Sequence, residues 1–184
     1  MQMKREYVVA VDKYNRKLGE VEKLKAHREG ILHRAFSVFI FDSNGNLILQ
    51  KRAENKYHSP LLWSNTCCGH PKPGEKSKFG AIRRLKEELG IECKIKKFGT
   101  IIYKLKVGDL IEHEFNTLFF GFYTGKMEPN PDEVADIKLA KLDFLLLDIK
   151  QNPELYTPWF RLILNHYSKE LMEIQKKSMV RFHI

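Results

Sequence analysis

The sequence has little of what marks a secreted or a membrane protein. Only three of its 184 residues are cysteine, and two of these are adjacent, so a framework of disulfide bonds is not expected. No apolar stretch approaches the ~20 residues that a membrane-spanning helix needs. Residues 1–6 are polar and charged and lack the apolar run of a signal peptide. These absences together predict a soluble protein of the reducing cytoplasm.

Acidic residues are also in the minority, because 23 Asp and Glu stand against 32 Lys and Arg, which leaves a net charge of +9. A charge of this sign suits a nucleic acid, an anionic small molecule such as a phosphate ester, or merely a lysine-rich solvated surface. The lysines are spread along the whole chain, which favours the solvated surface. Because no nucleic-acid-binding motif and no basic stripe with interleaved aromatic residues occurs, we expect no nucleic-acid partner.

Nothing in the sequence divides the chain into parts, because it has no internal repeat, no low-complexity segment and no Gly/Ser-rich linker. A hydrophobic content of 43% is ordinary for a globular protein. Residues 1–184 are therefore expected to form a single compact domain. Strand-like segments come first, then a helix, more strands and late helices, and this order predicts an α/β (α+β) fold.

Local patterns give approximate bounds for these elements. Strands are expected at 7–12, 34–41, 47–52, 94–106 and 112–124, with a turn at 13–19, a hairpin turn at 42–46 and a bend or bulge in the last strand pair. Helices are expected at 145–150 and 158–175, and the basic segment 169–184 is interpreted as a solvated helix. The best-defined helix is 77–89, where Phe79, Ile82, Leu85 and Leu89 recur at helical spacing before Gly90.

The densest signal is the loop and helix at 69–91, which reads G-H-P-K-P-G-E-K-S-K-F-G-A-I-R-R-L-K-E-E-L-G-I. A loop that leads into a helix presents backbone N–H groups to an anion. Carboxylates along one helix face can hold a hard cation, which in turn can clamp a diphosphate. The segment resembles the Nudix box, G-x5-E-x7-R-E-U-x-E-E-x-G-U with U apolar, at eight fixed positions: Gly69, Glu75, Arg83, Leu85, Glu87, Glu88, Gly90 and Ile91. The resemblance implies a Nudix-like mixed sheet flanked by helices.

One position departs from the box, because Arg84 stands where the family has glutamate. Hydrolases of the family use that carboxylate to coordinate metal ions for cleavage. An arginine cannot bind a metal ion, but its guanidinium can grip a phosphate oxygen. The departure therefore favours a diphosphate that is bound without being cut.

Segments around the box sharpen the resemblance: H-R-A-F-S-V-F-I-F at 33–41, S-N-T-C-C-G-H-P at 64–71, E-H-E at 112–114 and T-P-W at 157–159. Together with the box they resemble the type I isopentenyl-diphosphate isomerases, over about residues 23–159. The resemblance implies an isomerase of isoprenoid biosynthesis that interconverts isopentenyl and dimethylallyl diphosphate. That reaction adds a proton at C4 and removes one at C2, so it needs two positioned acid–base groups.

The resemblance also implies two metal ions. Three imidazoles and two carboxylates would hold one divalent ion, which mixed nitrogen and oxygen ligands allow to be Mn²⁺, Mg²⁺ or Zn²⁺; the matching positions are His27, His33, His70, Glu112 and Glu114. Because Glu112 and Glu114 are two residues apart, a strand would point both to one face and His113 to the other. Glu88 matches a residue that holds a second ion, Mg²⁺, on the substrate diphosphate. The spacing of His27 to His33 is a residue tighter than in some family members.

The remaining site residues are likewise implied by the family pattern. Cys68 and Glu114 match the two acid–base groups, and Tyr103 matches a residue near the site of proton delivery. Counting back from His70 selects Cys68 over Cys67, and an extended backbone would point the two thiols to opposite faces. Residues that match diphosphate contacts are Lys23, Arg52, Lys56 and Arg84, while Trp159 matches an aromatic residue that would stack over the carbocation in a cation–π contact of roughly 2 kcal/mol or more.

Two other functions stay open at this point. A Nudix hydrolase that cleaves a nucleoside diphosphate derivative would share the fold and the helix, although Arg84 and the Cys68 and His70 matches weigh against it. A nucleic-acid-binding domain without enzymatic activity rests on the net charge alone. For the isomerase we expect a small isoprenoid diphosphate as substrate, no membrane partner, and a monomer or weak homodimer.

Overall fold

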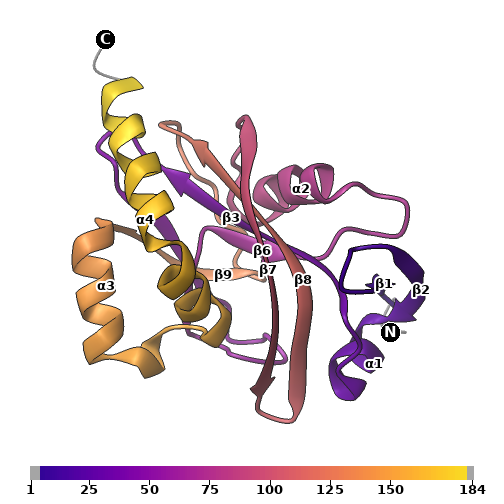
Figure 1. Ribbon diagram of the computed structural model, residues 1–184. Coiled ribbons are helices and arrows are strands. Elements are labelled where there is room, and N and C mark those ends of the chain that lie inside the picture. The colour runs from indigo at the N-terminus through magenta and orange to yellow at the C-terminus, as the bar shows by residue number, and fades with distance from the viewer. Residues whose placement is uncertain (1–4, 182–184) are drawn as a thin grey trace.

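The computed structural model describes residues 5–181, and within them nine strands form one sheet (Figure 1). The strands are β1 (Tyr7–Val11), β2 (Lys17–Glu22), β3 (His33–Phe41), β4 (Leu47–Arg52), β5 (Trp63–Ser64), β6 (Cys67–Gly69), β7 (Ile95–Val107), β8 (Leu110–Phe122) and β9 (Val134–Ala140). The helices are α1 (Lys23–Glu29), α2 (Ser77–Leu89), α3 (Leu142–Gln151), the short 3₁₀ helix η1 (Pro153–Leu155) and α4 (Pro158–Arg181). No helix within residues 5–181 has the length and apolar character needed to cross a membrane.

Strand β3 lies at the centre of the sheet. Its seven consecutive residues from Ala35 to Phe41 are all buried, which shows that both faces of this strand are covered. It pairs in parallel with β8, from His33 opposite Glu114 to Phe41 opposite Phe122. It also pairs antiparallel with β6, where Ser37 lies opposite Cys68. Strand β7 pairs antiparallel with β8, which puts Tyr103 opposite Glu114. These registers bring residues from four strands to one end of the sheet.

Helices cover both faces of the sheet, so the fold is the mixed sheet flanked by helices that the resemblance implies (Figure 1). On one face, α3 and α4 pack Leu145, Phe160 and Leu164 against strands β3 and β4. On the other face, α2 packs Ala81, Leu85 and Leu89 against the opposite sides of the same strands. The long hairpin β7–β8 extends past the end of β3 beside α1, and this overhang frames the site.

Several expected elements are confirmed by the structure, including the helix at 77–89 and the bulge in the last strand pair, which falls between Lys97 and Gly99. Others differ. The expected turn at 13–19 is shorter, because β2 begins at Lys17, and the first residue of the loop and helix at 69–91 belongs to strand β6. Phe79 is 59% exposed and is not part of the core.

The end of the chain also differs from its interpretation as a solvated helix. Helix α4 runs on to Arg181 and buries Leu171, Ile174 and Ser178 along one side. The helix is therefore amphipathic and not fully solvated, and the basic residues of this segment lie on its outer side. Residues 182–184 lie outside the described part of the chain.

Helix α1 and strand β9 were not expected from the sequence. Helix α1 has only seven residues and is capped by the Glu22 side chain, which accepts from the backbone N–H groups of Leu24 and Lys25. Glutamate is not among the preferred N-cap residues, so the sequence carries little signal for this helix start. Its end is clearer, because Gly30 adopts the left-handed conformation with φ of 63°.

Candidate functional site

A cavity of about 540 Å³ opens where the β7–β8 hairpin, α1 and the start of α4 meet. Nearly all of the residues that the family pattern singles out line it: Lys23, Arg52, Lys56, Cys68, His70, Arg84, Glu88, Tyr103, Glu112, Glu114 and Trp159. The two exceptions, His27 and His33, lie fully buried directly behind the wall. The structure thus brings all of the predicted site residues to one place.

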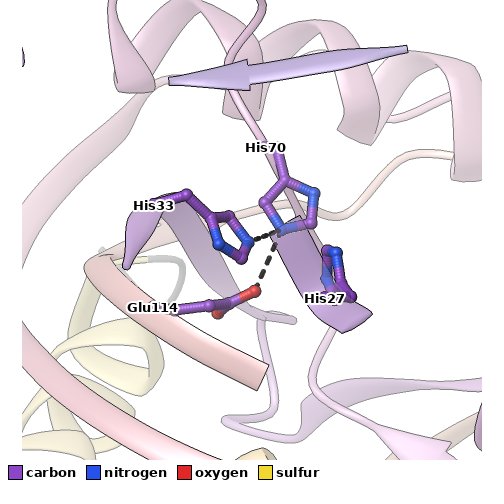
Figure 2. Close-up of side chains that lie close together, drawn as sticks. All are labelled: His27, His33, His70 and Glu114. Carbon is purple, nitrogen blue, oxygen red and sulfur yellow. Dashed lines mark hydrogen bonds and ion pairs between the residues drawn. The ribbon is translucent and has the colours of Figure 1, made fainter. Parts of the chain in front are cut away.

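Three imidazoles, of His27, His33 and His70, lie close together beside Glu114 (Figure 2). The Nε2 atoms of His33 and His70 are 3.1 Å apart, and His70 Nε2 lies 3.0 Å from Oε1 of Glu114. The ring of His27 lies with its centroid 4.8 Å from that of His33 and 5.3 Å from that of His70. The tighter spacing of His27 in the sequence therefore does not keep it out of the cluster.

Backbone carbonyls fix the orientation of two of these rings. Nδ1 of His27 lies 2.7 Å from the carbonyl oxygen of Lys23, and Nδ1 of His33 lies 2.8 Å from that of Ile31. Because a carbonyl oxygen can only accept, each Nδ1 carries a proton, and a neutral ring then turns an unprotonated Nε2 toward the cluster. Burial, aided by the charge of His70, lowers the pKa of His33 to about 4, so this ring is neutral near pH 7.

Two carboxylates from β8 adjoin the imidazoles, and both are buried on one face as their spacing predicts. Glu114 groups with His27, His33 and His70, whereas Glu112 groups with His27 and His58. Nε2 of His27 lies 3.5 Å from Oε1 of Glu112. Burial would raise the pKa of Glu112, but the imidazoles of His27 and His58 outweigh it and hold the pKa well below its usual value. His113, between the two carboxylates, points away and places Nδ1 2.8 Å from the carbonyl oxygen of Gly30.

Glu114 differs from Glu112 in its environment. Burial, with the charge of Glu112, raises the pKa of Glu114 to about 7. The Tyr103 hydroxyl donates a short hydrogen bond to Oε2 of Glu114, and Nδ2 of Asn116 lies 3.0 Å from the same oxygen. A carboxyl that titrates near neutral pH and is held by a hydroxyl can both give and take a proton.

The two adjacent cysteines point to opposite sides of the sheet, as expected for an extended backbone. Cys67 is fully buried in the core beneath α2. Cys68 packs on the α4 side and lines the cavity. Burial raises the pKa of the Cys68 thiol to about 12, so the sulfur holds its proton at neutral pH. Cys93 only packs at the edge of the α2 core.

Basic and acidic side chains alternate at the mouth of the cavity. The Arg84 guanidinium contacts three carboxylates, with Nη2 2.7 Å from Glu88 and 2.8 Å from Glu133, and Nη1 2.8 Å from Glu87. Lys56 also pairs with Glu133. The second oxygen of Glu88 accepts from Nε2 of Gln50 at 2.9 Å.

The remaining cations of the pattern lie across the cavity. Nζ of Lys23 pairs with Glu6 at 2.8 Å. The guanidinium of Arg52 lies over the Trp159 ring, 5.3 Å from its centroid. Cations therefore surround a space that is closed by an aromatic ring on one side, which suits an anionic tail attached to an apolar group.

The sequence reasoning missed four residues that the structure places at the site: Gln50, His58, Asn116 and Glu133. Asn116 had a usable signal, because it follows Glu114 by two residues on the same face of β8. His58 and Glu133 lie in irregular segments, where no periodicity reports which way a side chain points.

The donor set fits a divalent metal ion by its chemistry. Nε2 of His27 and Oε1 of Glu112 are buried without a hydrogen-bond partner among the described residues. One ligand atom from each of His27, His33, His70 and Glu114 lies within 4.8 Å of the others. Buried lone pairs that converge in this way are costly unless they share a cation. The cluster is therefore compatible with a divalent metal, and its ligand types do not decide which one.

Comparisons with known proteins agree with this geometry. A family model of the NUDIX domain matches residues 31–160. The chain is 48% identical over 159 residues to isopentenyl-diphosphate Delta-isomerase 2 of Aromatoleum aromaticum, covering 86% of this chain and 84% of that protein. It is 45% identical over 169 residues to isopentenyl-diphosphate Delta-isomerase 2 of Photorhabdus laumondii, covering 91% and 96%.

Solved structures are similar in fold. The crystal structure of DR0079 from Deinococcus radiodurans superposes with a TM-score of 0.74 at 16% sequence identity, covering 88% of this chain and 98% of that one. A C. elegans Ap4A hydrolase reaches a TM-score of 0.55 at 18% identity, covering 76% and 98%. At such identities the likeness concerns the fold alone.

Proposed function

The chain belongs to the NUDIX family and, within it, to the isopentenyl-diphosphate Delta-isomerases, and from that premise we propose how its own residues carry out the reaction. The activity is the interconversion of isopentenyl and dimethylallyl diphosphate. The observation that carries the proposal is that Cys68, Glu114 and Tyr103 line the same cavity as the cations Lys23, Arg52, Lys56 and Arg84.

The reaction moves a double bond by two proton transfers. A proton added at C4 leaves a tertiary cation at C3, and loss of a proton from C2 gives the allylic product. We propose Cys68 and Glu114 as the two acid–base groups, one serving each end of the reacting allyl unit. Because the reaction is reversible, each group gives a proton in one direction and takes one in the other.

Tyr103 supports Glu114 in this proposal. Its hydroxyl donates to the Glu114 carboxylate and lies 3.1 Å from Nδ2 of Asn116, so the carboxyl has a fixed orientation and a second group through which a proton can pass. Burial raises the pKa of Glu114 to about 7, and a positive ion bound beside this carboxyl would lower it again.

Trp159 closes the apolar side of the cavity and is itself 3% exposed. We propose that its ring faces the developing cation at C3. A cation–π contact of this kind contributes roughly 2 kcal/mol when water is excluded. The Arg52 guanidinium against the same ring holds it in place and is available to the diphosphate.

We propose that Lys23, Arg52, Lys56 and Arg84 bind the diphosphate, with Arg84 exchanging part of its carboxylate contacts for phosphate oxygens. Because Arg84 replaces the metal-binding glutamate of the hydrolases, the diphosphate is held and not cut. Glu88 would hold a Mg²⁺ ion on the diphosphate, since Mg²⁺ in such sites takes one or two carboxylates together with phosphate oxygens.

The finer identity of the inner ion is also a proposal. His27, His33, His70, Glu112 and Glu114 would hold one divalent ion, Mn²⁺, Mg²⁺ or Zn²⁺. The chemistry that such an ion supplies when bound is positive charge beside Glu114, which tunes the acidity of that carboxyl.

We further propose a single domain, acting in the cytoplasm as a monomer or weak homodimer on a small-molecule substrate.

The test is proton NMR of isopentenyl diphosphate incubated with the purified protein in heavy water, with Mg²⁺ or Mn²⁺ present. We expect deuterated dimethylallyl diphosphate to form, and Glu114→Gln to slow its formation roughly 10²–10⁴-fold, as for removal of an acid–base group. Release of phosphate without isomerised product would favour the hydrolase instead. Near-full activity of Glu114→Gln would overturn the roles assigned here.

A further inference from the structure

His58 lies at the site but is absent from the family positions used above. It belongs to the irregular segment between β4 and β5 and lines the cavity. Its side chain is only 9% exposed. A histidine buried at that depth beside a carboxylate is an unusual choice for a loop whose only task is to connect two strands.

The contact that His58 makes is to Glu112. Its Nε2 atom lies 3.0 Å from Oε1 of Glu112, closer than the 3.5 Å that separates His27 Nε2 from the same oxygen. The carboxylate can only accept, so the contact is favourable when this nitrogen of His58 carries the proton. His58 therefore approaches Glu112 from the side opposite His33 and His70, at ion-pair distance from the carboxylate.

The other edges of the His58 ring touch the aromatic wall of the cavity. The ring meets Trp159 edge-on, with centroids 5.5 Å apart and planes at 88°. It meets Tyr57 edge-on as well, at 4.5 Å and 90°. One imidazole thus connects the proposed ion site with the ring proposed to face the carbocation.

The backbone around His58 is held in place by Arg52. Its Nη2 atom donates to the carbonyl oxygen of His58 at 3.2 Å, and its Nε atom donates to that of Ser59 at 3.1 Å. Ser59 and Leu61 both have positive φ, 47° and 57°, although neither is glycine. Such residues persist only where surrounding contacts over-determine the conformation, and they cluster at functional sites.

We propose that His58 is a positioning residue for the isomerase reaction, holding Glu112 in the orientation that binds the inner metal ion and fixing that carboxylate relative to Trp159. The inference rests on the proposed function for its catalytic consequence only. A carboxylate that ligates a metal is itself oriented by hydrogen bonds, and loss of such an outer partner lowers metal affinity or activity by roughly 10–100-fold.

Three variants separate the donor from the shape of the ring. His58→Phe keeps a ring against Tyr57 and Trp159 but removes the donor. His58→Gln restores an N–H at nearly the position of Nε2. His166→Gln is the matched control, because His166 is exposed on α4 and makes only a local contact with the carbonyl oxygen of Leu162.

The first measurement is the dissociation constant of Mn²⁺ for each metal-stripped variant without substrate, by calorimetric titration. We expect His58→Phe to weaken Mn²⁺ binding about 10–100-fold, His58→Gln to stay within about threefold of the parent, and His166→Gln to be unchanged. Circular dichroism of the metal-stripped variants checks that they fold. Should His58→Phe not fold, His58→Asn replaces it, since its shorter amide cannot reach Glu112 and is expected to bind Mn²⁺ about tenfold more weakly.

The second measurement is steady-state kinetics at saturating Mn²⁺ and Mg²⁺. We expect kcat of His58→Phe to fall more than tenfold while KM for isopentenyl diphosphate changes less than threefold, since His58 touches no proposed diphosphate ligand except through its backbone. Parent-like Mn²⁺ affinity in His58→Phe, or equal loss in the Phe and Gln variants, would overturn the inference. Absence of isomerised product from the parent protein would instead overturn the proposed function. The Mn²⁺ titration would still test whether His58 positions Glu112 for metal binding.

Discussion

At the scale of single residues, Cys67 and Cys68 form a natural pair of experiment and control. Both are small thiols on neighbouring positions of β6, but Cys67 is fully buried whereas Cys68 is half-buried and faces the cavity. We expect Cys68→Ala to lower the rate of deuterium incorporation into dimethylallyl diphosphate roughly 10²–10⁴-fold. Cys67→Ala should keep the rate within a few-fold and lose about 1 kcal/mol of unfolding free energy from the core, measured in urea. Equal rates for the two variants would remove Cys68 from the mechanism.

Arg84 supports a second prediction at this scale. Hydrogen bonds to charged groups contribute roughly 1.5–3 kcal/mol, so Arg84→Gln is expected to raise KM for isopentenyl diphosphate about tenfold or more. If the contact is made equally in the ground and transition states, kcat changes little. Lys86→Gln is the control, because Lys86 lies on the same helix but pairs outward with Glu92. An unchanged KM in steady-state assays of Arg84→Gln would contradict a phosphate-binding role.

The grouping of the site residues in space could be predicted from the sequence, because Cys68, His70, Glu112 and Glu114 lie in short motifs with fixed spacing. The contacts of the site residues could not be predicted in the same way. The pairing of Arg84 with Glu133 could not be predicted, because Glu133 lies in a segment without periodicity; phosphate binding by Arg84 stays a prediction. His58 was missed for the same physical reason: a loop side chain is aimed by tertiary contacts, here those of Arg52, and not by a repeat in the chain.

At the scale of elements, the sequence predicts best where local and tertiary forces agree. Helix α2 has an apolar face of Ala81, Leu85 and Leu89 and a glycine at its end, so both its bounds are predicted. Strand β9 was not predicted, although residues 136–139 alternate polar and apolar as in a half-buried strand, because the alternation covers only four residues. Its strand conformation comes from pairing with β4, which is a non-local cause.

The contact between β7 and α4 gives a prediction at the element scale. A Cβ at Gly99 would lie 2.7 Å from Cε1 of Tyr167, and the Tyr167 hydroxyl donates to the carbonyl oxygen of Thr100 at 2.7 Å. Gly99→Ala must therefore displace the Tyr167 ring or shift α4. The expected cost is about 1–3 kcal/mol in unfolding free energy. Urea unfolding measures this cost.

Gly19 in β2 provides the matched control for that substitution. A Cβ there has no atom within 4 Å, and its φ is not in the left-handed region. Gly19→Ala should leave the stability unchanged or raise it by about 0.5 kcal/mol, because alanine loses less backbone entropy than glycine. If both alanine variants unfolded at the same urea concentration, the packing of Tyr167 on Gly99 would not contribute to stability.

At the scale of the whole molecule, a bound ion should stabilise the folded state by mass action. At a free Mn²⁺ concentration 100 times the dissociation constant the gain is about 2.7 kcal/mol. A chain of this size gains roughly 2–4 °C in Tm for each kcal/mol, so an increase of about 5–10 °C is expected over the chelator-treated protein. Differential scanning calorimetry measures it.

The same experiment with His33→Ala identifies where the ion acts. His33 lies at the centre of the imidazole cluster, so its loss should abolish most of the Mn²⁺-dependent rise in Tm. His166→Ala should keep the full rise, because His166 is exposed on α4. A rise of equal size in both variants would place the stabilising ion elsewhere in the protein.

The parallel pairing of β3 with β8 has a consequence for the order in which this protein folds. His33 and Glu114 stand opposite each other only when two strands from distant parts of the chain have met, and pairing over such separations is slow compared with helix formation. During refolding, ellipticity from α2 and α4 should therefore return before the chain can capture an ion. The ion site is then among the last features to mature, and a nascent chain stays inactive until β8 has joined the sheet.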